Sequence, residues 1–533
     1  MLARAEASSN TAVSQFSLGQ ILRRSTRLRG DALAVADLER ELTWNAIEQR
    51  VMKLAGALRG LGLRPGDRVA ILAQNSHRYL ELLFAVPWAG GVATPLNFRL
   101  ATVELAGILR DSGADMLVVD DIHQHLAHEL AAGGGLRHVI HAGTGQTEAG
   151  QKNYEALIDA ASAVADAGRS GDDLAALFYT SGSTGGPKGV MHSHANIAMA
   201  GLTSIPPFGL DEDCVGLISG PLFHVGSTGM CFPAMMAGAS IVVLPRFEPG
   251  LVIETIERYR ITNLTAVPTM LRMVADHPEA RRRDLSSLRT VTFGGAPMPD
   301  SLLTELLELA PRARYVHCYG MTETTASCSC LPPRYVLAES RHLGKALSIG
   351  KALPSIDIGI MDPADRELGP GAIGEIVVRG PIVTRGYWGK PEMSATTLRG
   401  GWMHTGDVGY LDEDGFLYIV DRLKDMIITG GENVYSREVE EAVYSFPGVA
   451  QCAVIGIPDE RWGERVHAIV TPSEGRTIDQ DELVAHCRAR IAGYKCPRSV
   501  EIRAEPLPLS GANKIDKPAL RAPYWAKRQS QLV

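Results

Sequence analysis

The feature that most constrains this chain is a glycine-rich loop that follows an apolar run. Residues 174–178 are predicted to form a buried strand, and residues 179–189 read Y-T-S-G-S-T-G-G-P-K-G. The carboxyl end of a strand is where open α/β sheets bind ligands. The glycines allow backbone N–H groups to turn inward, and the hydroxyls and the single lysine can contact phosphate oxygens. The stretch therefore predicts a phosphate-binding loop.

This loop does not have the spacing of a Walker A motif. Counted from Gly182, Pro187 stands where the second glycine belongs, and Gly189 stands where the magnesium-binding hydroxyl belongs. A flexible Gly/Ser linker is the alternative. Linkers, however, do not place Pro-Lys-Gly between a predicted strand and a second apolar run, so a phosphate loop of another kind is favoured.

Length and composition limit the class of protein. A chain of 533 residues is too long for one hydrophobic core and predicts three or four units of ordinary size. A hydrophobic content of 45% is typical of a globular protein. The formal net charge of −7 argues against a nucleic-acid partner held by a general basic field.

No segment predicts export or a membrane span. The start of the chain lacks an apolar signal-peptide core, residues 1–15 are expected to be disordered, and the run 231–244 is broken by Pro233 and Gly238. A cytoplasmic protein is therefore expected. The eight cysteines lack C-x-x-C spacing and are expected to be buried or idle thiols, with a metal site as the alternative.

Helical and strand patterns alternate along most of the chain. Such alternation predicts parallel sheets with helices on both faces, here as two α/β layers within residues 16–423. Strands are expected at residues 68–73, 92–96, 116–120, 215–219, 240–244, 263–267, 289–293 and 315–318. Helices are expected at residues 44–59, 79–89, 101–112, 251–260, 269–276 and 301–309, with Asp300 as the N-cap of the last.

Two further regions follow a different pattern. Residues 133–150 are Gly-rich and residues 166–173 are polar, so both are expected to be surface loops. At about residues 350–420 helical patterns disappear and a small β-barrel-like subdomain is expected. Residues 424–533 predict a small, mobile α+β C-terminal domain, with strands at 426–428, 452–456, 466–470 and near Val500 and helices at 436–446 and 480–491.

Five more motifs bring reactive side chains to strand ends and turns, although each residue type is common in structural roles. The motif P-L-F-H-V-G-S carries His224, and F-G-G-A-P spans residues 293–297. The motif Y-G-M-T-E-T-T carries Glu323, and W-M-H-T-G-D-V-G carries Asp407 in a turn. Near the C-terminus, L-P-L-S-G-A-N-K ends at Lys514. A carboxylate beside hydroxyls suits a hard cation such as Mg²⁺.

Together with the phosphate loop, these motifs resemble the adenylate-forming enzymes, the superfamily of acyl-CoA synthetases, luciferases and peptide-synthetase adenylation domains. The resemblance extends from about Phe16 to about Arg521, and six motifs occur in the family's order. It implies that the protein binds ATP and Mg²⁺ and uses coenzyme A as a co-substrate. Two positions depart from the usual pattern: Asn513 replaces the glycine before Lys514, and Gly226 replaces a tyrosine found in some aromatic-acid ligases.

The resemblance also implies roles for individual residues. Gly295, Ala296 and Tyr319 would hold adenine, Thr322 the α-phosphate, and Asp407 and Arg422 the ribose. Lys424 would be the hinge between the domains. The implied nucleotide site comprises Thr180, Ser181, Gly182, Ser183, Thr184, Gly185, Lys188, Gly295, Ala296, Pro297, Tyr319, Gly320, Met321, Thr322, Asp407, Arg422 and Lys514. The implied catalytic residues are Lys514, Thr184, Lys188, Glu323 and His224, of which Glu323 and Thr184 would bind the metal. The implied acyl pocket comprises His224, Val225, Gly226, Gly294, Gly320 and Met321.

The implied reaction joins a carboxylic acid to a thiol. The carboxylate would attack the α-phosphate of ATP, and a thiol would displace AMP from the acyl adenylate, with cations stabilising the charge. The stretch 427–440 is similar to that of fatty-acid and cinnamate-type CoA ligases, so an acyl-CoA synthetase for a medium- or long-chain fatty acid or another bulky apolar acid is expected.

Several alternatives stay open. They are an aryl- or cinnamate-type acid–CoA ligase, an acyl-AMP ligase that loads a carrier protein, and a silent nucleotide- or lipid-binding homologue. The terminal Gln-Leu-Val is not a peroxisomal address. The sequence does not indicate the number of subunits, and a homodimer is compatible with it.

Overall fold

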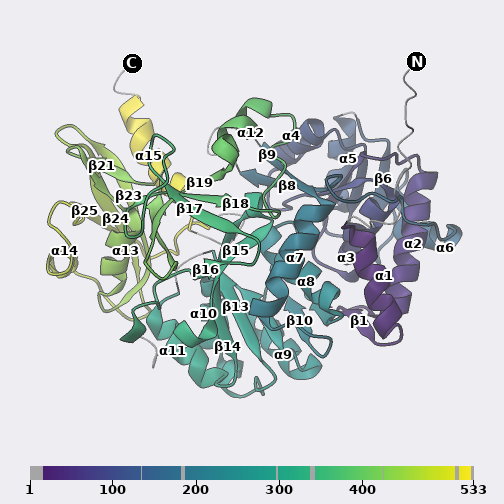
Figure 1. The fold of residues 1–533 in the computed structure, drawn as a ribbon, viewed down its shortest axis with the longest axis horizontal. Helices are drawn as coiled ribbons and strands as arrows, with labels where there is room; N and C mark the ends of the chain where they lie inside the picture. Colours follow the sequence, from purple (N-terminus) through teal and green to yellow (C-terminus); the bar gives the residue numbers. More distant parts are fainter. Residues whose placement is uncertain are drawn as a thin grey trace, which may run out of the picture.

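A computed structural model describes residues 16–133, 135–181, 187–295, 298–336, 342–423, 425–509 and 515–529. It contains a large N-terminal part built on three sheets and a smaller C-terminal part built on a fourth sheet (Figure 1). This arrangement confirms the predicted fold class, a large α/β domain followed by a small α+β domain.

The first large sheet has seven strands and is parallel except at one edge. Its order is β7-β6-β5-β3-β4-β8-β9, and only β9 runs antiparallel to its neighbour. The strands are β3 (Arg68–Leu72), β4 (Val92–Pro95), β5 (Met116–Val119), β6 (His138–His141), β7 (Lys152–Asn153), β8 (Leu174–Ser181) and β9 (Pro187–Ser193). Strand β6 lies inside the expected loop 133–150, because its four residues pair with β5 despite the Gly-rich flanks.

The second large sheet has nine strands in the order β16-β15-β14-β13-β12-β10-β11-β1-β2. Its central strands are parallel, and antiparallel strands close both edges. The strands are β1 (Leu33–Ala36), β2 (Glu41–Thr43), β10 (Val215–Ile218), β11 (Ser240–Val243), β12 (Asn263–Ala266), β13 (Thr290–Gly294), β14 (Arg314–Met321), β15 (Ala326–Leu331) and β16 (Lys351–Ala352).

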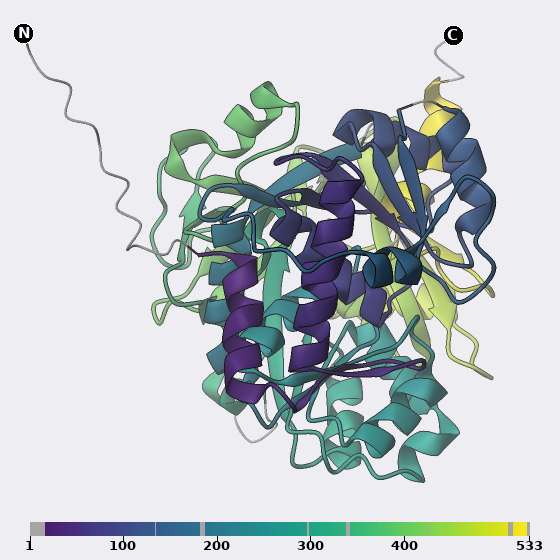
Figure 2. The ribbon, with the colours of Figure 1, turned by 90° about the vertical axis from the view of Figure 1, so that its right-hand side faces the viewer.

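A layer of helices lies between the two large sheets and forms the main core. All thirteen residues of α3 (His77–Ala89) are buried, which is the environment of a helix covered on all sides. In Figure 2 the purple helices α1 and α2 run side by side. This layer comprises α1 (Leu18–Arg29), α2 (Trp44–Gly60), α3, α7 (His194–Phe208) and α8 (Val225–Ala237).

Other helices cover the outer faces of these sheets. Helices α4 (Thr102–Ser112) and α5 (Gln124–Ala132) cover the seven-stranded sheet. The nine-stranded sheet is covered by α9 (Pro249–Tyr259), α10 (Pro268–Asp276) and α11 (Asp300–Leu309). The N-cap of α11 is Pro299, so the prediction that Asp300 caps it is wrong; the helix begins one residue earlier than its apolar pattern indicated.

The predicted β subdomain is a four-stranded antiparallel sheet. Its strands in order are β17 (Asp357–Met361), β18 (Gly374–Arg379), β19 (Met403–Leu411) and β20 (Leu417–Arg422). The region is not free of helices, because α12 (Pro391–Thr397) lies between β18 and β19. A helix of seven residues has too few turns to show a clear apolar period in the sequence.

The C-terminal part has helices on both faces of its sheet, at the left of Figure 1. Helices α13 (Ser436–Tyr444) and α14 (Gln480–Arg488) pack on one face, and α15 (Lys517–Gln529) packs on the other. The strands are β21 (Ile427–Thr429), β22 (Glu432–Val434), β23 (Val449–Asp459), β24 (Gly463–Pro472) and β25 (Ser499–Ile502).

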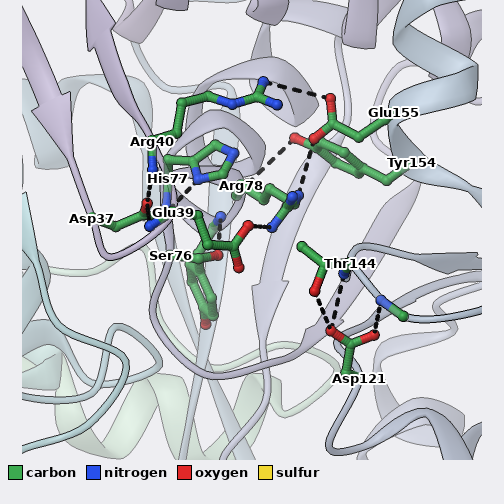
Figure 3. A network of polar contacts seen from close by, with 12 residues as sticks. Asp37, Glu39, Arg40, Ser76, His77, Arg78, Asp121, Thr144, Tyr154 and Glu155 are labelled. Carbon is green, nitrogen blue, oxygen red and sulfur yellow. Dashed lines mark hydrogen bonds and ion pairs between the residues drawn. The ribbon is translucent and has the colours of Figure 1, made fainter.

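A polar network ties the start of α3 to the turn between β1 and β2 and to α6 (Tyr154–Ala160), as Figure 3 shows. The His77 ring lies 2.6 Å from Asp37 Oδ2, and Arg78 donates to Glu39 and to Glu155 at 2.9 and 3.0 Å. These contacts fix three segments that are far apart in the sequence at one end of the helical layer.

The structure can be compared with the expectations about the cysteines and about membrane-spanning helices. All eight cysteines are buried and free, which confirms them as buried thiols. Cys318 and Cys330 face each other on β14 and β15 with their sulfur atoms 3.0 Å apart. Within the described ranges no helix is both long enough and apolar enough to cross a membrane.

Candidate active site

The phosphate loop joins β8 to β9 in an antiparallel hairpin. Thr180 on β8 pairs with Lys188 on β9, so both lie at the base of the loop, at the carboxyl end of β8 as expected. The expected loop residues Gly182, Ser183, Thr184 and Gly185 and the side chain of Ser181 lie outside the described residues. Of the loop's side chains, Thr180 and Lys188 can therefore be placed.

Lys188 lies beside a pair that the sequence analysis did not find. Its Nζ is 5.9 Å from the centroid of the Tyr387 ring, and the Tyr387 hydroxyl donates to Glu323 Oε1 at 2.8 Å. Burial, followed by the Glu323 carboxylate, raises the pKa of Tyr387. Tyr387 thus connects the phosphate loop to the predicted metal-binding carboxylate.

The segment that carries Tyr387 is held against β9 by backbone contacts. Trp388 N donates to Gly189 O at 2.8 Å, and Met191 N donates to Gly386 O at 2.9 Å. In the sequence, T-R-G-Y-W has one isolated arginine and no metal-binding pattern, so no signal marked it. Its contribution depends on a contact between residues nearly two hundred positions apart.

Glu323 lies in a tight, buried turn between β14 and β15. The turn is a 3₁₀ segment, Thr322–Thr324, followed by Thr325 and Ala326 with φ of +52° and +110°. Such angles are costly for residues with a Cβ and occur mostly where the surroundings enforce them. Here Thr384 N donates to Glu323 O at 2.8 Å and Thr325 Oγ1 donates to Ile382 O at 2.7 Å, so the backbone of the turn is held in place.

The residues around Glu323 fit a magnesium ion held together with phosphates. Among the described residues, no cluster of three His, Cys, Asp or Glu side chains could hold a metal without help. Mg²⁺ usually takes one or two carboxylates and completes its shell with phosphate oxygens and water. One buried carboxylate near the phosphate loop matches that donor set, and Thr184, the other predicted ligand, lies outside the described residues.

Tyr319, Asp407 and Arg422 form a second group, from β14, β19 and β20. The Tyr319 hydroxyl donates to Asp407 Oδ2 at 2.6 Å, and Arg422 Nε lies 3.1 Å from Asp407 Oδ1. Burial, followed by the charge of Asp407, raises the pKa of Tyr319 well above its usual value. Asp407 is 4% exposed. The structure therefore brings together three residues that were expected to contact adenine and ribose.

Gly294 and Gly320 allow strands β13, β14 and β15 to lie close together. A Cβ on Gly294 would lie 2.3 Å from Cys318 O, and a Cβ on Gly320 would lie 1.6 Å from Ala326 O. Gly295 has φ of +78°, which favours glycine. Ala296 and Pro297 lie outside the described residues. Strand β14 continues to Met321, so the Y-G-M residues are strand residues and Thr322 begins the buried turn.

His224 is the N-cap of α8, a helix that the sequence analysis did not predict. Its Nδ1 accepts a hydrogen bond from Gly226 N at 3.2 Å. Helix α8 is apolar on nearly all sides and contains Pro233, which hid its period. His224 therefore has a local structural role. Its position beside the carboxylate of the acyl substrate stays a prediction.

A narrow apolar cavity lies beyond the Glu323 turn; its volume is about 10 Å³, roughly the room for one water molecule. Of the expected pocket residues, Val225 is in its wall; His224, Gly226, Gly294, Gly320 and Met321 are not in that wall as described. The sequence analysis missed most of the wall, because it comes from five elements, β8, β9, α7, α8 and β15 with the turn before it. The lining residues are Phe178, His192, Ile197, Ala200, Gly201, Val225, Thr228, Gly229, Phe232, Pro233, Thr325 and Ala326.

The predicted hinge and the mobile lysine cannot be placed, since Lys424 and Lys514 lie outside the described residues. The junction between the domains is nonetheless anchored. Ser436 Oγ donates to Asp421 Oδ1 at 3.0 Å, and Lys517 Nζ donates to Ser436 Oγ at 2.7 Å. The last strand of the large domain is thus joined to α13 and to the residues that follow Lys514.

Comparison with known proteins agrees with this geometry. The model of the AMP-binding enzyme family matches residues 22–388, and the model of the AMP-binding enzyme C-terminal domain matches residues 438–514. A feruloyl-CoA synthase from Amycolatopsis sp is 43% identical over 93% of this chain and 97% of its own. The long-chain-fatty-acid–CoA ligase FadD13 from Mycobacterium tuberculosis is 34% identical over 91% of this chain and 93% of its own.

A solved structure extends the similarity to three dimensions. The crystal structure of ATP-bound MatB from Rhodopseudomonas palustris superposes with a TM-score of 0.86 at 31% identity, covering 95% of this chain and 99% of that one. The family models and the relative at 43% identity together cover most of the chain. The chain therefore belongs to the AMP-binding enzyme family, and it is an acid–thiol ligase of the adenylate-forming superfamily.

Proposed function

We propose that this chain is an AMP-forming aryl acid–CoA ligase that accepts aryl and arylalkenoic acids. The observation that carries the proposal is the cavity beside the Glu323 turn. Thr325 and Ala326 belong to its wall and follow the 3₁₀ segment whose residues Thr322 and Glu323 are expected to contact the α-phosphate and the metal. The cavity is narrow, so its wall would have to move apart to admit an acid, which would then hold its carboxylate near the phosphates.

The chemistry of the wall supports a ring over a long flexible chain. Phe178 and Phe232 offer two aromatic faces, and the helices α7 and α8 contribute small residues. Aromatic side chains favour stacked or edge-on contact with another ring. The identity of 43% with a feruloyl-CoA synthase, against 34% with a long-chain-fatty-acid–CoA ligase, also favours the aryl alternative over the fatty acid expected first.

The residues of the site have separable roles in the first half-reaction. Tyr319, Asp407 and Arg422 would orient the nucleoside of ATP. Lys188 would neutralise phosphate oxygens, and Glu323, oriented by Tyr387, would hold the metal. Bound Mg²⁺ would supply further charge neutralisation at the phosphates. With the charges balanced, the acid's carboxylate oxygen can attack the α-phosphorus and release pyrophosphate.

The second half-reaction would use coenzyme A. Its thiol would attack the acyl carbon, forming the thioester and releasing AMP. We propose that residues 424–533 rotate about Lys424 between the two steps, replacing Lys514 by the incoming thiol. A Lys424→Pro variant should release pyrophosphate normally but form thioester slowly, because proline restricts the backbone at the pivot. An unchanged rate of thioester formation would contradict the rotation.

The function can be tested with purified protein, ATP, Mg²⁺ and a panel of acids. Pyrophosphate release should be fastest with cinnamic or benzoic acids and slow with hexadecanoic acid, and AMP release should need coenzyme A. Activity confined to fatty acids would overturn the aryl assignment. Transfer to a carrier protein in place of coenzyme A would identify a carrier-loading ligase, and no acid-dependent pyrophosphate would indicate a silent homologue.

A further inference from the structure

The cavity contains one polar side chain whose role the proposed function does not explain. His192 lies on β9, the strand that begins beside the phosphate loop. Side chains an even number of residues apart on a strand point to the same face, so His192 shares a face with Lys188. It is fully buried, lines the cavity, and its ring centroid lies 5.3 Å from that of Phe178.

The His192 ring makes one weak backbone contact and no well-formed hydrogen bond. Among the described residues, neither Nδ1 nor Nε2 has a partner of good hydrogen-bond geometry, and the contact that the ring makes is with the Thr322 backbone. A buried polar group without a partner costs free energy and is uncommon in native structures, so each instance calls for an explanation. Burial lowers the pKa of His192 to about 4, and the contact with the Thr322 backbone opposes that shift. The ring is therefore neutral at pH 7, and the nitrogen that does not face Thr322 can bond to a ligand.

The other polar side chains of the wall already have partners. Thr228 Oγ1 donates to Val225 O at 3.2 Å, and Thr325 Oγ1 donates to Ile382 O at 2.7 Å. The remaining lining residues are apolar or glycine. His192 is therefore the lining side chain with hydrogen-bonding capacity to give to a ligand.

We propose that His192 determines specificity by a hydrogen bond to a ring hydroxyl, so that the substrates are phenolic arylalkenoic acids. This inference rests on the proposed function, because it needs an aryl acid in the cavity. A neutral imidazole can accept the phenolic proton or donate to the phenolic oxygen. A site built around such a bond disfavours an analogue without the hydroxyl, because one imidazole nitrogen would then be left buried without a partner.

The test compares 4-hydroxycinnamic acid with cinnamic acid. Wild-type enzyme should show a kcat/KM ratio for the two acids of about 10 or more in favour of the hydroxylated acid. His192→Phe should bring the ratio close to one and leave the KM for ATP unchanged. His192→Gln retains a donor and an acceptor and should keep part of the preference.

A matched control is available two residues further along. His194 is also a buried histidine, but its Nδ1 accepts from Leu18 N at 3.2 Å, and it is not part of the cavity wall as described. His194→Gln should leave the ratio unchanged. Thermal unfolding of each variant verifies that it is folded.

The outcomes separate the inference from the proposed function. If aryl acids are activated but the wild-type enzyme treats both acids alike, the specificity role fails and the aryl-ligase function stands. The specificity role also fails, and the aryl-ligase function stands, if His192→Phe keeps the preference for the hydroxylated acid. If no aryl acid is activated, the specificity role and the aryl-ligase function both fail. Because the wild-type ratio alone can overturn the inference, a variant that does not fold leaves it testable.

Discussion

The hydroxyl of Tyr319 donates a 2.6 Å hydrogen bond to Oδ2 of Asp407, which joins the nine-stranded sheet to the four-stranded sheet. Arg422, the cross-strand neighbour of Asp407, contacts the other carboxylate oxygen. The carboxylate is therefore oriented before any nucleotide arrives. Such preorganisation reduces the cost of ordering the site on binding.

Removal of the Asp407 carboxylate should weaken ATP binding. Asp407→Ala should raise the KM for ATP about 10- to 100-fold, the size expected for losing hydrogen bonds to a charged group. Tyr319→Phe leaves the contact with Arg422 and should have a smaller effect. Steady-state kinetics at saturating acid measures both values. Tyr418→Phe serves as the control, since its hydroxyl contacts Gly344 O and Asp412 away from this group. An unchanged KM in Asp407→Ala would refute the assignment.

The contact between Tyr387 and Glu323 predicts a dependence on magnesium. Glu323→Gln should raise the Mg²⁺ concentration for half-maximal pyrophosphate release by about 10-fold or more, because the neutral amide is a poorer ligand. Tyr387→Phe removes only the orienting hydrogen bond and should produce a smaller shift. A magnesium titration of each variant gives the values. The exposed Glu413→Gln is the control, and identical curves for Glu323→Gln and wild type would exclude this carboxylate as a ligand.

Lys514 is expected to act in the first half-reaction. Lys514→Ala should slow pyrophosphate release by about 10²–10³, as for loss of other preorganised charge-stabilising donors. Thioester formation from a supplied acyl adenylate should be nearly normal, because that step does not transfer phosphate. Single-turnover assays of each half separate the two rates. The exposed Lys152→Ala is the control, and an equal loss in both halves would point to a structural defect.

The cavity is narrow enough that one methyl group should matter. A Cβ on Gly229 would lie 2.8 Å from the Cβ of Ala326 across the wall. Gly229→Ala should therefore lower kcat/KM for aryl acids while leaving the KM for ATP unchanged. Gly107 is a helical glycine whose added Cβ meets no atom within 4 Å, so Gly107→Ala is the control. A gain in activity toward all acids would contradict this location for the acyl group.

Buried histidines predict a loss of stability in mild acid. Burial lowers the pKa values of His192, His194 and His317 to about 4. Between pH 6.5 and 4 the unfolded chain binds protons that the folded chain does not, so the free energy of unfolding falls as the pH falls. Each histidine should contribute about 2–3 kcal/mol of this loss by pH 4.5. Calorimetry should show a lower Tm at pH 4.5 than at pH 7, and His194→Gln should reduce the difference between the two Tm values. A Tm independent of pH would contradict the predicted loss of stability.

Local pattern predicted much of the fold. The strands and helices of residues 215–309 that show a clear apolar period begin or end within two residues of the expected positions. Strong alternation leaves few choices, because an apolar stripe must be buried on one face. Among the missed helices, α7 and α8 are apolar on most sides and contain prolines, so neither period nor helix-former content marked them.

The sequence by itself predicted which residues meet a nucleotide, because six motifs occur in the order that the adenylate-forming family has. Only the tertiary structure decided that Tyr387 donates to Glu323 and that His192 lines the apolar cavity without a well-formed hydrogen bond. Both facts depend on the packing of segments distant in the chain. Burial and the absence of a partner are properties of that packing, and no local pattern encodes them.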